Sequence, residues 1–203
     1  MRTSAEQVRK NYERIRAEVG PNVTVVAATK YANLDTMELL AEAGVAVVGE
    51  NRAQDLAAKR NRFGDRFRWH FIGHLQSRKA KDVSHLCELV HSLDSVSAAK
   101  RLTIPALVEV NLAGEETKSG IAREQLSSFL REVAELGVEV RGLMTMPPLA
   151  DDPERSRPFF RELRQLAGEH GLAELSMGTS QDYPVAAEEG ATLVRVGSVL
   201  FGR

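Results

Sequence analysis

Apolar and polar residues follow two alternating patterns along the chain. Short apolar runs rich in β-branched residues indicate buried strands, and longer stretches with an apolar residue every three or four positions indicate amphipathic helices. A helix is expected first, over Ser4–Val19, because Val8, Tyr12, Ile15 and Val19 share one face.

Eight strand candidates follow this helix, with helical patterns between them. The strands are expected at Val23–Thr29, Val45–Gly49, Trp69–Ile72, Leu89–Leu93, Ala106–Asn111, Val138–Met144, Leu175–Met177 and Leu193–Val196. The helices are expected at Leu34–Ala43, Ala53–Arg62, Ser77–Leu86, Arg123–Leu136, Pro153–His170 and Tyr183–Glu189. Strands that alternate with helical crossovers predict an α/β fold with a parallel sheet.

The order of these elements favours a barrel. No glycine-rich dinucleotide fingerprint follows the first strand, which argues against a Rossmann arrangement. We therefore predict a (β/α)8 TIM-type barrel with an extra N-terminal helix, formed as one domain by residues 1–203. One crossover is unusually short, since only Ser95–Arg101 is helix-like before the fifth strand and about a dozen residues are normally needed. Either this crossover is truncated or residues are absent from the sequence.

Composition and net charge limit the kinds of partner and the compartment that we expect for this protein. The net charge of −1 gives no reason to expect nucleic acid or an anionic membrane surface as a partner. The single cysteine, Cys87, permits no internal disulfide, which fits a reducing compartment. No apolar stretch is long enough to span a bilayer. We expect a cytoplasmic protein.

Lys30 is the first candidate for chemistry, because it closes the first apolar run. Burial at a strand end would favour its neutral amine, which is a nucleophile toward carbonyl groups. The alternative is a strand-end lysine whose amine extends to water and has no chemical role.

Two late turns are candidates for binding phosphate. Leu175–Ser180 and Val194–Ser198 each lead from a strand through a small, glycine-containing turn into a helix. In barrel enzymes the loops after strands seven and eight frequently bind phosphate, since backbone N–H groups and the helix dipole face the anion there. The alternative is that Ser180 and Ser198 only cap these helices.

Arg195 lies inside the eighth strand, where alternation points it away from the side of Val194 and Val196 and into the barrel. A buried guanidinium needs a partner, and a structural ion pair with Glu50 or Glu109 is one candidate. Together, an amine, an arginine and a phosphate cup would meet the needs of pyridoxal 5′-phosphate (PLP): a partner for its aldehyde, its ring nitrogen and its phosphate.

The chain resembles the PLP homeostasis protein family, which is similar to the barrel domain of alanine racemase. The resemblance rests on segments in the same order over nearly the whole chain. They are Gly49–Asn51, Trp69–Ser77, His91–Asp94, Val110–Asn111, Lys118–Gly120, Gly142–Met146, Leu175–Gly178 and Val194–Gly202.

The resemblance implies that PLP forms a Schiff base with Lys30. It also implies Arg195 at the pyridine nitrogen, Asn51 near the ring, and a phosphate site that includes Ser180, Gly197 and Ser198. Ser176 and Thr179 complete the expected cofactor site, although the family usually has methionine in place of Thr179.

No metal site is expected. His70 and His74 are four residues apart, but they lie across a strand end and Gly73, where four residues span roughly 13 Å. Met144, Met146 and Pro147–Pro148 end the sixth strand and are expected to shape a lid, although core packing explains the methionines equally well.

The expected role is to hold and pass on PLP within the cell, without robust catalysis. An arginine partner leaves the ring nitrogen unprotonated, which weakens the ring as an electron sink. The alternatives are a PLP-dependent amino-acid racemase and an aldolase-type barrel enzyme that uses Lys30. A racemase needs a second base, which the alanine racemase family takes from an additional domain, and we expect none because the sequence ends soon after the eighth strand. Candidate partners are PLP and PLP-dependent apo-enzymes, and we expect a monomer or weak dimer.

Overall fold

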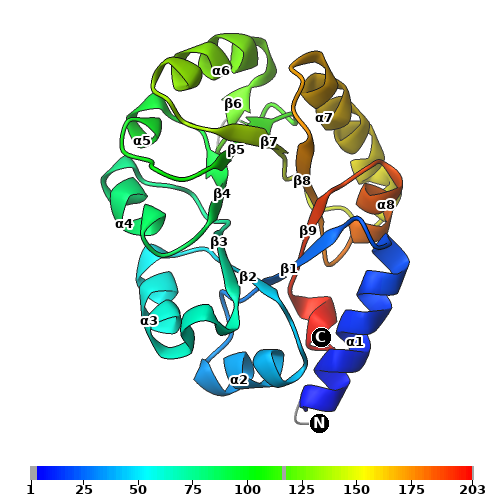
Figure 1. The fold of residues 1–203 in the computed structure, drawn as a ribbon. Coiled ribbons are helices and arrows are strands. Elements are labelled where there is room, and N and C mark those ends of the chain that lie inside the picture. Colours follow the sequence, from blue (N-terminus) through cyan, green and yellow to red (C-terminus); the bar gives the residue numbers. More distant parts are fainter. Residues whose placement is uncertain (1–3, 116–117, 203) are drawn as a thin grey trace.

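The strands of this computed structural model, which describes residues 4–115 and 118–202, form a closed parallel barrel (Figure 1). The barrel strands are β1 (Thr24–Ala28), β2 (Val47–Glu50), β3 (Arg68–Phe71), β4 (Leu89–Leu93), β5 (Ala106–Asn111), β7 (Val140–Met144), β8 (Glu174–Thr179) and β9 (Leu193–Val196). Each strand pairs with its neighbours in this order, and β9 pairs with β1 to close the circle. The prediction of a (β/α)8 barrel is confirmed.

Helices form an outer ring around the strands (Figure 1). They are α1 (Ala5–Val19), α2 (Leu34–Glu42), α3 (Ala53–Phe63), α4 (Ala80–Ser84), α5 (Val96–Ala99), α6 (Leu126–Glu135), α7 (Arg157–Glu169) and α8 (Tyr183–Glu188). The leading helix α1 begins after Ser4, whose hydroxyl accepts a hydrogen bond from the backbone N–H of Gln7. Short 3₁₀ turns flank several helices, at Gly64–Arg66, Ser77–Lys79, Arg123–Gln125 and Pro153–Ser156, and a further one, Ser198–Leu200, follows β9. In the described part of the chain, each helix is too short or too polar to cross a membrane.

Alternation along each strand separates two hydrophobic cores. The smaller core fills the barrel itself and consists of Val26, Val47, Leu89, Leu107, Met144 and Leu193. The larger core lies between the strands and the helices and includes Val194 and Val196 of β9. Because side chains two apart share a face, Arg195 points to the same interior as Leu193. The inward orientation predicted for Arg195 is therefore confirmed.

The structure differs from the expected elements in two places. A two-residue strand β6 (Ile121–Ala122), too short to leave a sequence pattern, pairs with the end of β5. The expected helix Ser77–Leu86 is a 3₁₀ turn followed by the five-residue α4. The short crossover after Ser95 contains only α5, yet β4 and β5 still pair through Val90 and Ala106.

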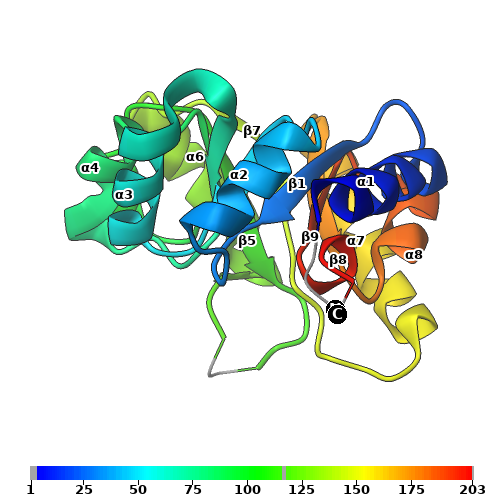
Figure 2. The ribbon, with the colours of Figure 1, turned by 90° about the horizontal axis from the view of Figure 1, so that it is seen from below.

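The carboxyl ends of the strands define one side of the barrel. The loop after β7 extends on the side where the chain ends, as the perpendicular view shows (Figure 2). Barrel enzymes place their active sites at this side, because the loops after the strands meet there.

Candidate functional site

A cavity of about 410 Å³ lies at the carboxyl ends of β1, β2, β8 and β9. This volume falls within the range of small-molecule sites in proteins. Seven of the eight residues predicted for the site line it, namely Lys30, Asn51, Thr179, Ser180, Arg195, Gly197 and Ser198. Residues that are distant in the sequence meet here because parallel strands end at the same side of the barrel.

Lys30 lies at the mouth of this cavity. The strand β1 ends at Ala28, Thr29 is fully buried and Lys30 is exposed. Its Nζ lies 4.7 Å from the centroid of the Tyr31 ring, a cation–π contact at the surface. Of the two readings of Lys30, the structure agrees with the amine that extends to water, because the chain turns outward after the buried Thr29. An exposed amine beside the cavity is open to a carbonyl group that enters from solvent.

Arg195 forms the floor of the cavity. Its Nη1 donates a hydrogen bond to Ser176 Oγ, and its Nη2 donates to the carbonyl oxygen of Thr145 at 3.0 Å. Burial lowers the pKa of Arg195 to about 10, with Glu109 opposing the shift. The guanidinium therefore stays charged at neutral pH. The suggested ion pair with Glu50 or Glu109 was wrong, because both hydrogen bonds go to neutral oxygens.

The two late turns meet as expected. Ser180 Oγ accepts a hydrogen bond from the backbone N–H of Gly197 at 2.9 Å and a longer one from Val199 at 3.5 Å. A Cβ atom built on Gly197 would meet nothing closer than 3.6 Å, so the space above this glycine is open toward the cavity. Ser198 is exposed at the start of the turn Ser198–Leu200. The turns thus bring the hydroxyls of Ser180 and Ser198 to one open space, where they can donate to an anion.

Thr179 is held by a residue that sequence reasoning missed. Its backbone N–H and its hydroxyl both donate to Asp182 Oδ1, at 2.7 and 3.0 Å. Ser156 donates to the other carboxylate oxygen, at 2.7 Å. An acidic residue three positions after Thr179, before α8, is a known helix-start pattern and could have indicated this contact.

Asn51 borders the cavity beside β3. Its side-chain Oδ1 is buried and has no hydrogen-bond partner among the described residues. A buried acceptor of this kind is costly without a partner. Just after β3 the chain passes close to Asn51 at Gly73. A Cβ atom at Gly73 would lie 2.1 Å from the backbone oxygen of Asn51, so only glycine permits this approach. The orphaned amide is thus available to a ligand in the cavity.

A buried ion pair supports Lys30 and Asn51 from below. Lys59 of α3 donates hydrogen bonds to Glu50 Oε1 and to the backbone oxygen of Thr29. Glu50 also accepts from the hydroxyl of Thr29 at 2.6 Å and from the backbone N–H of Asn51 at 3.3 Å. Lys59 was not among the predicted residues, because helical periodicity did not distinguish it from a surface lysine.

Ser176 does not line the cavity. It is fully buried in the barrel, where its hydroxyl contacts Arg195 and lies 2.8 Å from His91 Nδ1. In this structure Ser176 reaches the cavity only through Arg195. The two histidines considered for a metal also separate, since His70 points into the barrel and the exposed His74 lies 3.4 Å from Asp94.

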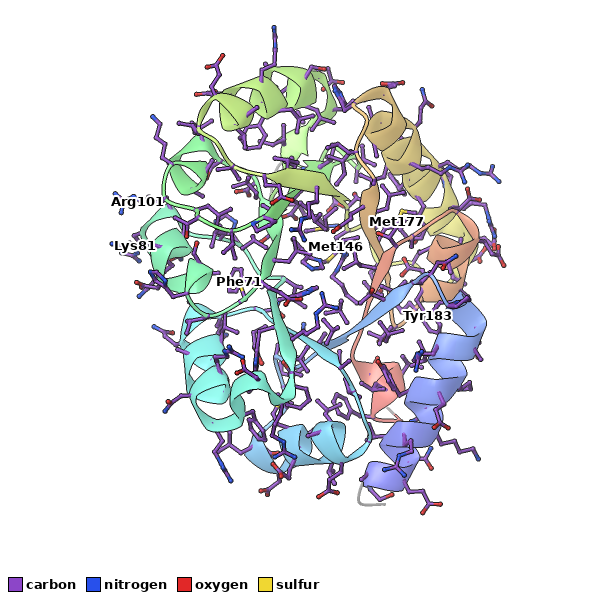
Figure 3. The ribbon with its side chains drawn as sticks, viewed as in Figure 1. Phe71, Lys81, Arg101, Met146, Met177 and Tyr183 are labelled. Carbon is purple, nitrogen blue, oxygen red and sulfur yellow. The ribbon has the colours of Figure 1, made fainter. Side chains whose placement is uncertain are left out.

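The two methionines of the expected lid take different places. Met144 packs in the barrel interior, whereas Met146 is half exposed and lines the cavity. Met146 lies near the centre of the view down the barrel, while Lys81 and Arg101 extend outward (Figure 3). Further lining residues that the sequence did not single out are Tyr31, Thr36, Ile72, Gln181 and Phe201. Their only sequence signal is their position just after strand ends, in the loops that follow or, for Thr36, in the first turn of α2.

Known proteins are similar to this chain over nearly its full length. The family described as the N-terminal domain of alanine racemase matches residues 4–203. A pyridoxal phosphate homeostasis protein from Aquifex aeolicus is 40% identical over 97% of this chain and 93% of its own length. The chain belongs to the pyridoxal phosphate homeostasis protein family. A family member from Deinococcus radiodurans is 41% identical over 88% of each chain.

Solved structures extend the comparison to the fold. PipY of Synechococcus elongatus, a structure with PLP bound, superposes with a TM-score of 0.88 and 31% identity, covering 96% of this chain and all of that one. Alanine racemase from Corynebacterium glutamicum superposes with a TM-score of 0.77 at 15% identity, over 98% of this chain and 61% of that chain. The second likeness shows the shared barrel alone.

Proposed function

We propose that this protein binds PLP in the cavity at the carboxyl ends of β1, β2, β8 and β9, as a Schiff base on Lys30, and acts in PLP homeostasis. The observation that carries the proposal is the meeting of Lys30, Arg195 and the two late turns around one cavity. The PLP-bound structure of PipY, a relative with 31% identity over 96% of this chain, supports the same ligand.

The residues present fit the cofactor. Lys30 supplies an accessible amine that condenses with an aldehyde and releases water. Ser180, Gly197 and Ser198 surround the open space suited to a phosphate, and Arg195 faces the cavity as a charged donor. The orphaned Oδ1 of Asn51 gives a further polar contact that no protein group uses in the described structure.

Arg195 favours a carrier over an enzyme. Bound PLP supplies an electron sink for amino-acid chemistry, and the sink is strongest when its ring nitrogen carries a proton. With a pKa near 10, Arg195 remains a donor at neutral pH and leaves that nitrogen unprotonated. The exposure of Lys30 favours exchange, because water and incoming amines can reach its amine from outside.

We further propose that the protein works in the cytoplasm, as a monomer or weak dimer, and passes PLP to PLP-dependent apo-enzymes. The single cysteine fits a reducing compartment. Transfer is tested by adding the loaded protein to an apo-enzyme and measuring whether activity returns faster than with an equal amount of free PLP.

The first experiment compares visible absorption of the purified protein, of Lys30→Ala and of the exposed control Lys100→Ala, each after incubation with PLP. We expect a yellow Schiff-base band in the wild type and in Lys100→Ala, and its loss in Lys30→Ala. A wild type that stays colourless with excess PLP would overturn the cofactor assignment and favour an aldolase-type enzyme. Turnover of an amino acid that depends on Lys30 would instead favour a racemase over a carrier.

A further inference from the structure

A line of hydrogen bonds crosses the barrel interior beneath Arg195. Arg195 Nη1 contacts Ser176 Oγ, which lies 2.8 Å from His91 Nδ1. His91 Nε2 lies 2.9 Å from His70 Nδ1, and His70 Nε2 lies 3.1 Å from Glu88 Oε1. Ser176, His91 and His70 are each at most 2% exposed, so water does not compete for these contacts.

The line joins two cavities at opposite ends of the barrel. Arg195 lines the cavity proposed for PLP. His70 and Glu88 line a second cavity of about 400 Å³, bordered by residues near the strand starts such as Thr24 and Leu193. Four strands contribute, since His70 lies on β3, His91 on β4, Ser176 on β8 and Arg195 on β9.

The groups at the two ends of the line fix the direction in which its hydrogen bonds are donated. Arg195 can only donate, so Ser176 Oγ accepts from it. The buried hydroxyl proton of Ser176 then has His91 Nδ1 as its acceptor. At the other end, the hydrogen bonds from Arg68 and His70 outweigh partial burial and lower the pKa of Glu88, so its carboxylate accepts from His70 Nε2–H.

His91 and His70, in the middle of the line, can pass on this direction of donation only if each ring is neutral. Burial lowers the pKa of His70 to about 4 and lowers the pKa of His91 well below its usual value. A neutral histidine that donates through Nε2 accepts through Nδ1. His91 Nε2–H therefore donates to His70 Nδ1, and all four contacts point from Arg195 toward Glu88.

We infer that Ser176, His91 and His70 are positioning residues. They hold Arg195 in the orientation from which it donates a hydrogen bond to the ring nitrogen of PLP. Because the hydroxyl proton of Ser176 is committed to His91, its oxygen presents only lone pairs to Arg195. Nη1 and Nη2 are then each anchored by one acceptor, Ser176 Oγ and Thr145 O. The remaining N–H groups of Arg195 are left for the cavity. This inference rests on the proposed binding of PLP.

The first test needs no cofactor. Nitrogen-15 NMR of the histidine side chains in the PLP-free protein reports which ring nitrogen carries the proton. We expect His70 and His91 to stay neutral from pH 6 to 8, each protonated at Nε2 only. A proton on Nδ1 of either ring, or a charged His91 in this range, would overturn the inference even if PLP binds.

The second test breaks the line at Ser176. Ser176→Ala removes the acceptor of Arg195 and the donor to His91. We expect the variant to form the yellow band with a PLP dissociation constant raised roughly tenfold, and His91 to lose its single tautomer. Ser176→Thr keeps the hydroxyl and should restore both readouts, and the control His85→Asn, at an exposed histidine outside the line, should change neither.

The outcomes separate this inference from the proposed function. Unchanged PLP affinity and an unchanged His91 tautomer in Ser176→Ala would overturn the positioning role while PLP binding stands. A wild type that binds no PLP would overturn the proposed function, and with it the role toward the ring nitrogen, whatever tautomers the histidines show. If Ser176→Ala fails to fold, Ser176→Thr and the wild-type NMR measurement still decide.

Discussion

Lys59 Nζ lies 2.7 Å from the backbone oxygen of Thr29, the residue before Lys30. The same amine pairs with Glu50, which is fully buried, and this pair joins α3 to the ends of β1 and β2. Removing one member of a buried pair leaves the other charge without compensation. We predict that Lys59→Met lowers the free energy of unfolding by about 3–5 kcal/mol, measured by urea denaturation.

The control for Lys59→Met is a surface ion pair. Lys79→Met removes a pair with Asp82 in which both side chains are at least 41% exposed, and it should cost less than about 1 kcal/mol. The double variant Glu50→Leu/Lys59→Met should recover much of the loss, because no charge remains buried. Equal effects of Lys59→Met and Lys79→Met would refute the role given to the buried pair.

Gly73 sets the position of Asn51. A methyl group at Gly73 would lie 2.1 Å from the backbone oxygen of Asn51, far inside van der Waals contact. We predict that Gly73→Ala destabilises the protein by about 1–3 kcal/mol and weakens PLP binding, because the backbone of Asn51 must shift. Thermal denaturation and a PLP titration of the visible band measure the two effects.

Gly168 provides the matched control for Gly73. It lies within α7, and a Cβ there would meet no atom within 4 Å. Gly168→Ala should therefore raise the free energy of unfolding by about 0.5–1 kcal/mol through its higher helix propensity. If Gly73→Ala were as well tolerated as Gly168→Ala, close approach would not explain the glycine at position 73.

The sequence predicted which distant residues lie together at the cavity better than it predicted the burial and the contacts of each residue. Lys30, Ser180 and Ser198 follow predicted strands and Arg195 lies inside the last one, and a barrel of parallel strands brings their carboxyl ends to one side. The exposure of Lys30 could not be predicted, because it depends on where the chain turns after β1. Helical periodicity did not reveal the contact of Lys59 with Thr29, which lies 30 residues away.

The line from Arg195 to Glu88 shows a different limit of sequence reasoning. His70, His91 and Ser176 each lie in a short strand that also contains other polar residues, and no spacing relates them. Only the stagger of strands around the barrel brings residues 85 positions apart, such as His91 and Ser176, into contact. Alternation alone could have shown that each points inward, but not that they touch.

Cys87 is half-buried and should not behave as a reactive thiol. Its Sγ donates a hydrogen bond to the backbone oxygen of Val83, and burial raises the pKa of the thiol to about 12. The thiolate is the reactive form, and it is scarce at pH 8 when the pKa is this high. We predict slow reaction of the native protein with a disulfide reagent at pH 8 and a fast reaction in urea. Equal rates in the two conditions would contradict this assignment.

Glu109 should make the protein less stable as the pH rises. Burial, and then the nearby charge of Asp94, raise the pKa of Glu109 from 4.5 to about 7. A folded-state pKa above the unfolded value gives stability that is full below about pH 4.5 and is lost as the pH rises through 7. Glu109→Gln removes this titration and should therefore be more stable than the wild type by about 2–3 kcal/mol at pH 8, relative to their difference at pH 4.5.

The comparison of Glu109→Gln with the wild type also removes the opposite pH dependence that His70 gives to the stability. The neutral His70, with its pKa lowered to about 4, loses stability as the pH falls below 6.5, and it does so in both proteins. Its contribution cancels when the unfolding free energies of the two proteins are subtracted at each pH. A constant difference between Glu109→Gln and the wild type across the range would show that Glu109 titrates alike in the folded and unfolded chains.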